Sequence, residues 1–370
     1  MKIQAAVVRE KGGAFGIEEI ELAEPQPNEV LVRIVGAGVC HTDMIVRDQM
    51  YPTPLPAVLG HEGSGVVEAV GAGVSSVEPG DRVVLSFDFD DTCRSCRAGH
   101  PAYCESFFEH NFGGARPEDE TSPLSKDGDR ISGRFFGQSS FATHAIATER
   151  NVVPVADDVP LELLGPLGCG VQTGAGGVIN SLNPQAGDSI AVFGAGSVGL
   201  SAVMAADLKG CTEIVAIDVQ PNRLEKAAAL GATTTVNPTA VDDVVEVVRE
   251  RTGSGPDYAL ETTGVPEVAE QAVASLTWRG TLGVIGAPAL GTRASYDVND
   301  LLLNGRTITG IVEGNAIPRD FIPDLIELYR QGKFPFDELI TYYEFEEIEQ
   351  AVEDSESGET IKPVLRMSEP

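Results

Sequence analysis

The chain has 370 residues, enough for two domains, and its hydrophobic content of 42% is typical of a folded globular protein. It carries 56 acidic and 26 basic residues, and a formal net charge of −30 opposes binding to nucleic acid or to anionic membrane surfaces. No apolar stretch approaches the ~18–20 residues of a membrane span and the start has no signal-peptide core, so we expect a cytoplasmic protein.

The acidic excess also bears on the source of the protein. Lysine is scarce, and arginine supplies most of the positive charge. This balance resembles the proteins of salt-loving organisms, because at ~1 M salt the Debye length shrinks to ~3 Å and self-repulsion is largely screened. We therefore predict a halophilic source, with a merely acidic protein of a mesophile as the alternative.

The first 150 residues are rich in valine, glycine and proline. Short alternating or apolar runs are separated by turn signals such as Glu78-Pro79-Gly80-Asp81, which is typical of a mostly β domain. The predicted strands cover residues 3–8, 30–35, 65–70 and 82–85.

Three side chains in polar or glycine-rich settings are candidate ligands of a soft metal. Cys40 stands in Cys40-His41-Thr42-Asp43, His61 in Gly60-His61-Glu62-Gly63, and Cys169 between two glycines. Two thiolates and one imidazole are a set with which proteins hold a catalytic zinc, and they leave a fourth position for water or an alcohol oxygen. Each of them alone would more often be a buried packing residue. Together they favour zinc.

The remaining cysteines divide into a cluster and a single residue. Cys93, Cys96 and Cys104 lie close together, which in a long, cytoplasmic chain favours metal binding over disulfides. Cys211 precedes an apolar run and is predicted to pack. The polar segment 105–133 is long for a loop, and we expect a surface excursion or local disorder there.

From about residue 171 strands alternate with helices, which predicts a parallel, doubly wound sheet. The predicted helices cover 201–208 and 222–230, with Gly231 as the residue that ends the second. The tail 362–365 could return to the first domain and complete it. The predicted strands cover 189–193, 213–217, 257–260 and 281–285.

A nucleotide-binding motif follows the first of these strands. Gly194-Ala195-Gly196-Ser197-Val198-Gly199 is a G-x-G-x-x-G that leaves a strand and opens a helix, and we expect Gly194, Gly196, Ser197, Val198 and Gly199 to meet a cofactor pyrophosphate. The alternative is a structural glycine turn.

The second strand ends at Asp218, whose carboxylate can bind both ribose hydroxyls and would repel a 2′-phosphate. This favours NAD over NADP. Arg223 could bind a phosphate, or pack near the adenine edge.

On these motifs the chain resembles the zinc-containing, medium-chain alcohol dehydrogenases, and among them it is most similar to the aryl-alcohol (benzyl alcohol) dehydrogenases. The marks, besides the Gly194 motif, are Gly38-Val39-Cys40-His41-Thr42-Asp43, Gly60-His61-Glu62-Gly63, Gly99-His100-Pro101, Phe136-Gly137-Gln138-Ser139-Ser140-Phe141, Gly168-Cys169-Gly170-Val171-Gln172-Thr173-Gly174 and Gly305-Arg306.

The resemblance implies an α/β protein with a GroES-like, mostly β catalytic domain over residues 1–170, completed by 313–370. It implies a Rossmann domain that binds NAD over residues 171–312. We also expect a homodimer or homotetramer that acts on a small-molecule alcohol or aldehyde.

The resemblance also implies roles for single residues. Cys40, His61 and Cys169 match the catalytic zinc ligands, and Glu62 matches a residue behind the zinc that can ligate it transiently. Thr42 matches the hydroxyl that takes the substrate proton, and Asp43 a carboxylate that orients the histidine ligand. His41 and Lys362 match positions that meet the cofactor pyrophosphate. Zinc would lower the pKa of a bound alcohol, and hydride would pass to NAD.

Two positions depart from the family pattern. Ile45 stands where family members often carry a histidine that relays the proton, so the proton would leave through the cofactor ribose and His41, or through solvent. The second zinc of the family is held by four cysteines, and here Asp90 replaces the first of them, ahead of Cys93, Cys96 and Cys104. We favour an occupied but weaker zinc site, with a ligand at Asp91 or a metal-free lobe as alternatives.

Other functions stay open at this point. Polyol and sugar dehydrogenases replace a cysteine ligand by a glutamate before a proline, whereas this chain has Gly165-Pro166 and keeps its cysteine. A formaldehyde dehydrogenase of the same superfamily and a zinc-free NAD-binding relative without enzymatic activity are the further alternatives.

Overall fold

A computed structural model describes residues 1–368. The chain forms two compact units, the first made of Met1–Cys169, Ile317–Leu325 and the chain from Leu339 onward. The second unit contains Gly170–Ala316 and Ile326–Glu338, so helix α10 (Pro318–Arg330) is divided between the two. No helix among residues 1–368 is long and apolar enough to cross a membrane. The predicted α/β class, with one mostly β unit and one doubly wound unit, is confirmed.

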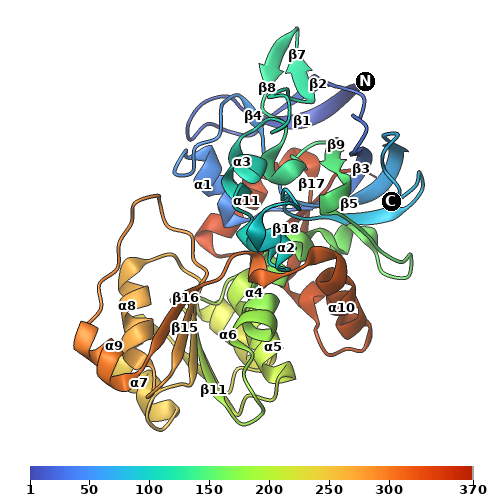
Figure 1. Ribbon diagram of the computed structural model, residues 1–370. Coiled ribbons are helices and arrows are strands. Elements are labelled where there is room, and N and C mark those ends of the chain that lie inside the picture. The colour runs from blue at the N-terminus through green and yellow to red at the C-terminus, as the bar shows by residue number, and fades with distance from the viewer. Residues whose placement is uncertain (369–370) are drawn as a thin grey trace. The chain divides into compact units, whose positions relative to one another are not determined.

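The first unit contains two sheets (Figure 1). One is fully antiparallel and runs in the order β4-β1-β2-β7-β8; its strands are β1 (Lys2–Val8), β2 (Gly16–Leu22), β4 (Ala57–Val58), β7 (Leu124–Lys126) and β8 (Asp129–Ile131). The other runs β10-β6-β5-β3-β18-β17, with β9 also paired to β3; its strands are β3 (Glu29–Gly38), β5 (Glu62–Val70), β6 (Arg82–Leu85), β9 (His144–Thr148), β10 (Val152–Pro154), β17 (Ile340–Glu344) and β18 (Lys362–Arg366).

Strand β3 is the centre of the second sheet. Its residues Val30–Ile34 alternate little in burial because both faces of the strand are covered, so an apolar run and not an alternating one marks it in the sequence. The C-terminal strand β18 pairs antiparallel with β3, Val364 opposite Gly38, so this strand lies in the second sheet of the first unit. The short helices of this unit are α1 (His41–Arg47), α2 (Arg94–Arg97), α3 (Phe107–Phe112) and α11 (Ile348–Ser357).

The second unit is built on a six-stranded parallel sheet in the order β13-β12-β11-β14-β15-β16. The strands are β11 (Ser189–Phe193), β12 (Glu213–Ile217), β13 (Thr234–Val236), β14 (Tyr258–Glu261), β15 (Thr281–Val284) and β16 (Thr307–Gly310). The order reverses between β11 and β14, which in such sheets is where a dinucleotide binds.

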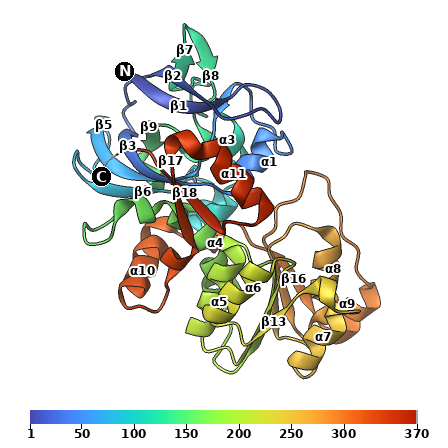
Figure 2. The ribbon, with the colours of Figure 1, turned by 180° about the vertical axis from the view of Figure 1, so that it is seen from behind.

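Helices cover both faces of the parallel sheet. Figure 1 and Figure 2 show α5 and α6 on one face and α7, α8 and α9 on the other. The helices are α4 (Gly170–Gly176), α5 (Ser197–Leu208), α6 (Pro221–Ala229), α7 (Val244–Arg251), α8 (Pro266–Ser275) and α9 (Val298–Asn304). Cys211 is buried just before β12, as predicted for a packing residue.

The polar segment 105–133 is neither a simple surface excursion nor disordered. It contains α3 and the β7–β8 hairpin, which extends the first sheet at β2. Arg116 from this segment is buried and pairs with both carboxylate oxygens of Glu29, at 2.7 and 2.9 Å. The polar composition therefore reflects a buried ion pair as well as exposed turns.

Candidate metal centres and nucleotide site

The first unit gathers the three predicted catalytic ligands into one cluster in which all but Cys40 are buried. One ligand atom each of Cys40, His61, Glu62 and Cys169 lies within 4.8 Å of the others. Cys40 precedes α1, His61 precedes β5, and Cys169 follows the 3-10 turn Gly165–Gly168. Three separate segments of the chain thus meet at one point.

Asp43 connects two of the ligands. Its Oδ2 accepts a hydrogen bond from the Cys40 N–H at 2.9 Å, and its Oδ1 accepts from the Gly60 N–H at 3.1 Å. The same Oδ1 lies 2.9 Å from His61 Nδ1, so the imidazole carries its proton on Nδ1 and presents Nε2 as a free lone pair. Asp43 therefore links the His61 ring to the backbone of the Cys40 and Gly60 segments.

His61 Nε2 provides a test of whether the cluster fits a metal. This atom is buried and has no hydrogen-bond partner among the described residues, which is costly for a polar atom unless a ligand satisfies it. Two thiols lie beside it. A nitrogen with a free lone pair and two thiols suit zinc, which is borderline soft and accepts both donor types.

Charged groups around the cluster favour the thiolate form that a metal needs. A hydrogen bond with Cys169 and the positive charge of Lys362 hold the pKa of the Cys40 thiol well below its ordinary value. Burial raises the pKa of the Glu62 carboxyl, and the Lys362 ammonium opposes this effect. The cluster is thus prepared to bind a cation.

Lys362 is buried beside Glu62 of the cluster. Its side chain is 1% exposed, and Nζ donates to both Glu62 oxygens at 2.9 and 2.8 Å. Its third donor reaches the Val39 carbonyl oxygen at 3.2 Å. Burial alone would lower the pKa of Lys362, but the Glu62 carboxylate outweighs it and raises that pKa.

The other predicted catalytic residues differ in exposure. Thr42 Oγ1 lies 3.8 Å from Cys40 Sγ and is half-buried. His41 is exposed at the first position of α1. Ile45, in the place of a relay histidine, is a buried apolar side chain that cannot carry a proton.

A second cluster lies in the lobe formed by residues 90–104, after β6. One ligand atom each of Asp90, Cys93, Cys96 and Cys104 lies within 4.8 Å of the others, and Asp91 is not among them. Backbone N–H groups of Cys96 and Glu105 donate to Cys93 Sγ at 3.5 and 3.4 Å and lower the pKa of that thiol.

The carboxylate of Asp90 is held in place by its neighbours. Its Oδ1 accepts from the N–H groups of Thr92 and Cys93 at 2.6 and 2.8 Å. Burial opposes ionisation, but these hydrogen bonds outweigh it and hold the pKa of Asp90 well below its ordinary value. Three thiols and an ionised carboxylate form a donor set that zinc accepts.

We propose Asp90 as the fourth ligand of a structural zinc and expect Asp90→Ala to empty this site. The variant keeps three thiols, whereas structural zinc sites use four donors. Zinc per chain after dialysis against a weak chelator should fall from about two ions to about one in Asp90→Ala. Asp91→Ala is the matched control and should retain both. Equal loss in the two variants, or a single zinc in the unsubstituted protein, would contradict the assignment.

A charged network that the sequence does not reveal lies at the base of this lobe. Asp88 is fully buried and accepts from Thr148 Oγ1 at 2.9 Å, and from Arg134 and Arg150 at 3.3 Å. Burial opposes its ionisation, but His110 and the two arginines hold the pKa of Asp88 well below its ordinary value. The network fixes the segment between β6 and Asp90, the first residue of the second cluster.

Aromatic rings surround the histidine ligand. Phe136 lies 4.5 Å from the His61 ring, centroid to centroid, and Phe135 lies 5.3 Å from it. Phe112 contacts Phe136 at 5.3 Å and stacks on Phe108 at 4.7 Å. Phe108 is 43% exposed, so the ring contacts extend from the cluster to the surface of the first unit.

In the second unit the predicted glycine turn has the geometry of a phosphate cradle. Gly194 has a φ of +96°, and a Cβ at Gly199 would lie 1.8 Å from the Gly194 oxygen. A Cβ at Gly196 would meet nothing within 4 Å, so the space beside it is open for a ligand. Ser197 and Val198 form the first turn of α5, whose free N–H groups favour an anion. These residues fit a dinucleotide pyrophosphate.

Asp218 lies one residue beyond β12, as predicted. Its Oδ2 accepts from the Ala195 N–H at 2.7 Å, and its Oδ1 from the Gln220 N–H at 2.8 Å. Arg223 Nη1 lies 3.9 Å from Oδ2, so the arginine faces the carboxylate. The acid that would meet the ribose is thus tied to the glycine turn.

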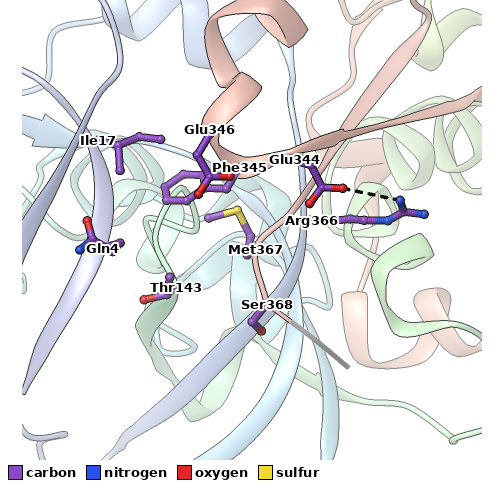
Figure 3. A pocket seen from close by; sticks show the side chains of 9 residues that line it. All are labelled: Gln4, Ile17, Thr143, Glu344, Phe345, Glu346, Arg366, Met367 and Ser368. Carbon is purple, nitrogen blue, oxygen red and sulfur yellow. Dashed lines mark ion pairs between the residues drawn. The ribbon is translucent and has the colours of Figure 1, made fainter.

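A cavity of about 450 Å³ in the first unit lies outside both clusters (Figure 3). Phe345 and Met367 form its apolar wall, and the Glu344–Arg366 pair, 3.9 Å apart, stands at its side. None of the predicted site residues lines it. The chemistry therefore belongs to the buried clusters and not to this cavity.

Comparison with known proteins agrees with the geometry. Residues 26–157 match the alcohol dehydrogenase GroES-like domain, and residues 197–331 match the zinc-binding dehydrogenase domain. A geraniol dehydrogenase of Castellaniella defragrans is 49% identical over 362 residues, which is 98% of this chain and 97% of that protein.

Two solved structures are similar over the full length of both chains. The alcohol dehydrogenase zinc-binding domain protein from Burkholderia ambifaria has 55% identity and a TM-score of 0.97, with 100% of each chain covered. The benzyl alcohol dehydrogenase from Acinetobacter calcoaceticus has 50% identity and a TM-score of 0.96, again with 100% of each chain covered.

Proposed function

Because the chain belongs to the zinc-binding alcohol dehydrogenase family, we propose that it oxidises primary, aromatic alcohols to aldehydes, and catalyses the reverse, with zinc and NAD. The cluster of Cys40, His61 and Cys169 carries this proposal, because His61 Nε2 is buried and has no hydrogen-bond partner among residues 1–368, as expected for a metal ligand. A zinc ion bound there would lower the pKa of an alcohol oxygen toward neutrality.

The surrounding residues supply positioning and proton transfer. Asp43 keeps His61 in the tautomer that leaves Nε2 free. The Thr42 hydroxyl, beside the Cys40 sulfur, is the group we assign to accept the alcohol proton while it gives up its own hydroxyl proton. Since Ile45 is apolar, the proton would then reach solvent through the exposed His41.

Aromatic side chains support an aromatic substrate. Phe135 and Phe136 contact the ligand His61, and apolar rings favour a flat, apolar substrate over a polyol with many hydroxyls to satisfy. The relatives named for benzyl alcohol and for geraniol also support an apolar alcohol. The cysteine at position 169 argues against the polyol class, as it does in the sequence.

Asp218 supports NAD as the cofactor. Its carboxylate is held at the end of β12 by the Ala195 and Gln220 N–H groups. A fixed negative charge there can accept from ribose hydroxyls but repels a 2′-phosphate. Arg223 only partly offsets this charge at a distance of 3.9 Å.

The assay that tests this function uses the full-length, zinc-loaded protein. We expect benzyl alcohol with NAD to raise the absorbance of reduced nicotinamide, and NADP, aliphatic alcohols and polyols to be slower in kcat/KM. Running the panel in dilute buffer and at ~1 M salt also tests the predicted halophilic source, because screening at molar salt stabilises so acidic a chain. Turnover with polyols alone, or with no alcohol at all, would overturn the proposal.

A further inference from the structure

Gln138 is a buried side chain beside the catalytic cluster, and both the nitrogen and the oxygen of its amide make hydrogen bonds. Its side chain is 1% exposed, and its Nε2 donates to the His61 carbonyl oxygen at 2.9 Å and to the Ser86 carbonyl oxygen at 3.1 Å. Its Oε1 accepts from the Gly63 N–H at 3.0 Å. The opposite orientation of the amide would point an oxygen at two carbonyls, so only this orientation satisfies every partner.

Ser86 extends this connection to the third ligand. Its buried Oγ donates to the Gly168 carbonyl oxygen at 2.7 Å. The Gly168 carbonyl is part of the peptide bond to Cys169. The carbonyl that Gln138 contacts is that of His61 itself, so each hydrogen bond reaches the backbone of a predicted zinc ligand. Gly168 is packed so closely that an added Cβ would lie 2.1 Å from the Leu85 oxygen. The Cys169 segment is therefore held against the end of β6.

The two links have different partners. Asp43 connects Cys40 with His61. Gln138 and Ser86 connect the His61 peptide with the Cys169 peptide through β6. The three ligand segments are thus fastened in pairs by two separate sets of side chains.

We propose that Gln138 and Ser86 are positioning residues that set the spacing between His61 Nε2 and Cys169 Sγ for zinc. The inference rests on the proposed zinc site but not on the substrate or on turnover. Ligand distances to zinc are about 2.0–2.3 Å, so a displacement of a few tenths of an ångström in either peptide weakens binding. Groups that hold metal ligands from behind typically contribute ~10–100-fold in metal affinity.

The test measures zinc binding by the full chain in competition with a chromophoric chelator. Ser86→Ala and Gln138→Glu are expected to weaken zinc binding at the catalytic cluster by ~10–100-fold. The cobalt-substituted variants should show shifted ligand-field bands, which a merely structural change elsewhere would leave alone. Ser86→Thr keeps the hydroxyl and should restore affinity.

Ser140→Ala is the matched control. Ser140 is fully buried in the same segment as Gln138, but its Oγ has no hydrogen-bond partner among the described residues. It should therefore keep the affinity and the cobalt spectrum of the unsubstituted protein. Unchanged zinc affinity in both Ser86→Ala and Gln138→Glu would overturn the proposal, and so would an equal loss in Ser140→Ala. A protein that binds zinc as expected but oxidises no alcohol would refute the proposed function and leave this inference standing.

Discussion

Replacing Cys169 with serine is expected to reduce alcohol oxidation by roughly a thousandfold or more, because metal catalysis lowers the activation barrier by several kcal/mol. The serine side chain has the same shape as cysteine, but its oxygen is smaller than sulfur and stays protonated at neutral pH, so it cannot replace a thiolate ligand. Cys169 is buried in the cluster with Cys40 and His61, and no other thiol in the described chain lies within that cluster. The measurement is kcat/KM with benzyl alcohol and NAD, together with zinc per chain.

Cys211→Ser is the matched control for this loss. Cys211 is also a buried, free cysteine, but it lies in the second unit and belongs to neither cluster. It should keep both its zinc and most of its kcat/KM. A Cys169→Ser protein with near-normal turnover, or one whose melting temperature collapses with its activity, would count against a role of Cys169 as a ligand.

Replacing Lys362 with methionine is expected to cost about 3–5 kcal/mol of unfolding free energy, as for other buried ion pairs that lose one partner. The methionine fills similar volume but leaves the Glu62 carboxylate buried without its counter-ion, and the Val39 carbonyl loses a donor. Chemical denaturation followed by the fluorescence of the protein measures the shift. We expect a lower denaturant midpoint and a lower melting temperature.

Two further variants separate the buried charge from lost packing. Lys362→Met combined with Glu62→Gln removes the orphaned charge and should recover part of the stability, which a double-mutant cycle quantifies. Lys2→Met removes the cation of an exposed pair with Glu19 and should change stability little, because water screens such pairs. If Lys362→Met unfolds with the same free energy as Lys2→Met, the buried Lys362–Glu62 pair does not stabilise the fold.

Local patterns explain why much of the fold could be predicted. The runs 189–193 and 213–217 coincide with β11 and β12, because strands covered on both faces are continuously apolar. The turn at Gly194 was also predictable from its three closely spaced glycines, of which Gly194 has a positive φ and Gly199 has no room for a Cβ. The halophilic source, the cytoplasmic location and the oligomeric state stay predictions.

Long-range contacts explain what could not be predicted. Segment 105–133 was expected to be a surface excursion or disordered from its polar composition, yet Arg116 is buried against Glu29, a residue far away in the chain. Gln138 and Ser86 are polar residues without any local signal of a role, because their partners are carbonyl groups on other segments. The roles of Gln138 and Ser86 therefore follow only from contacts between segments that are distant in the sequence.

The sequence by itself determined which donor atoms are available: two thiols, an imidazole, an altered second set with Asp90, and a glycine turn followed by an acid. These follow from residue type and short spacing, which the backbone geometry of a turn or helix start converts directly into structure. The tertiary structure decided what each donor faces. It placed Asp90 rather than Asp91 among the thiols, and Lys362 against Glu62 in a buried ion pair. The physical reason is that burial and charge pairing depend on segments up to 300 residues apart, which no local pattern encodes.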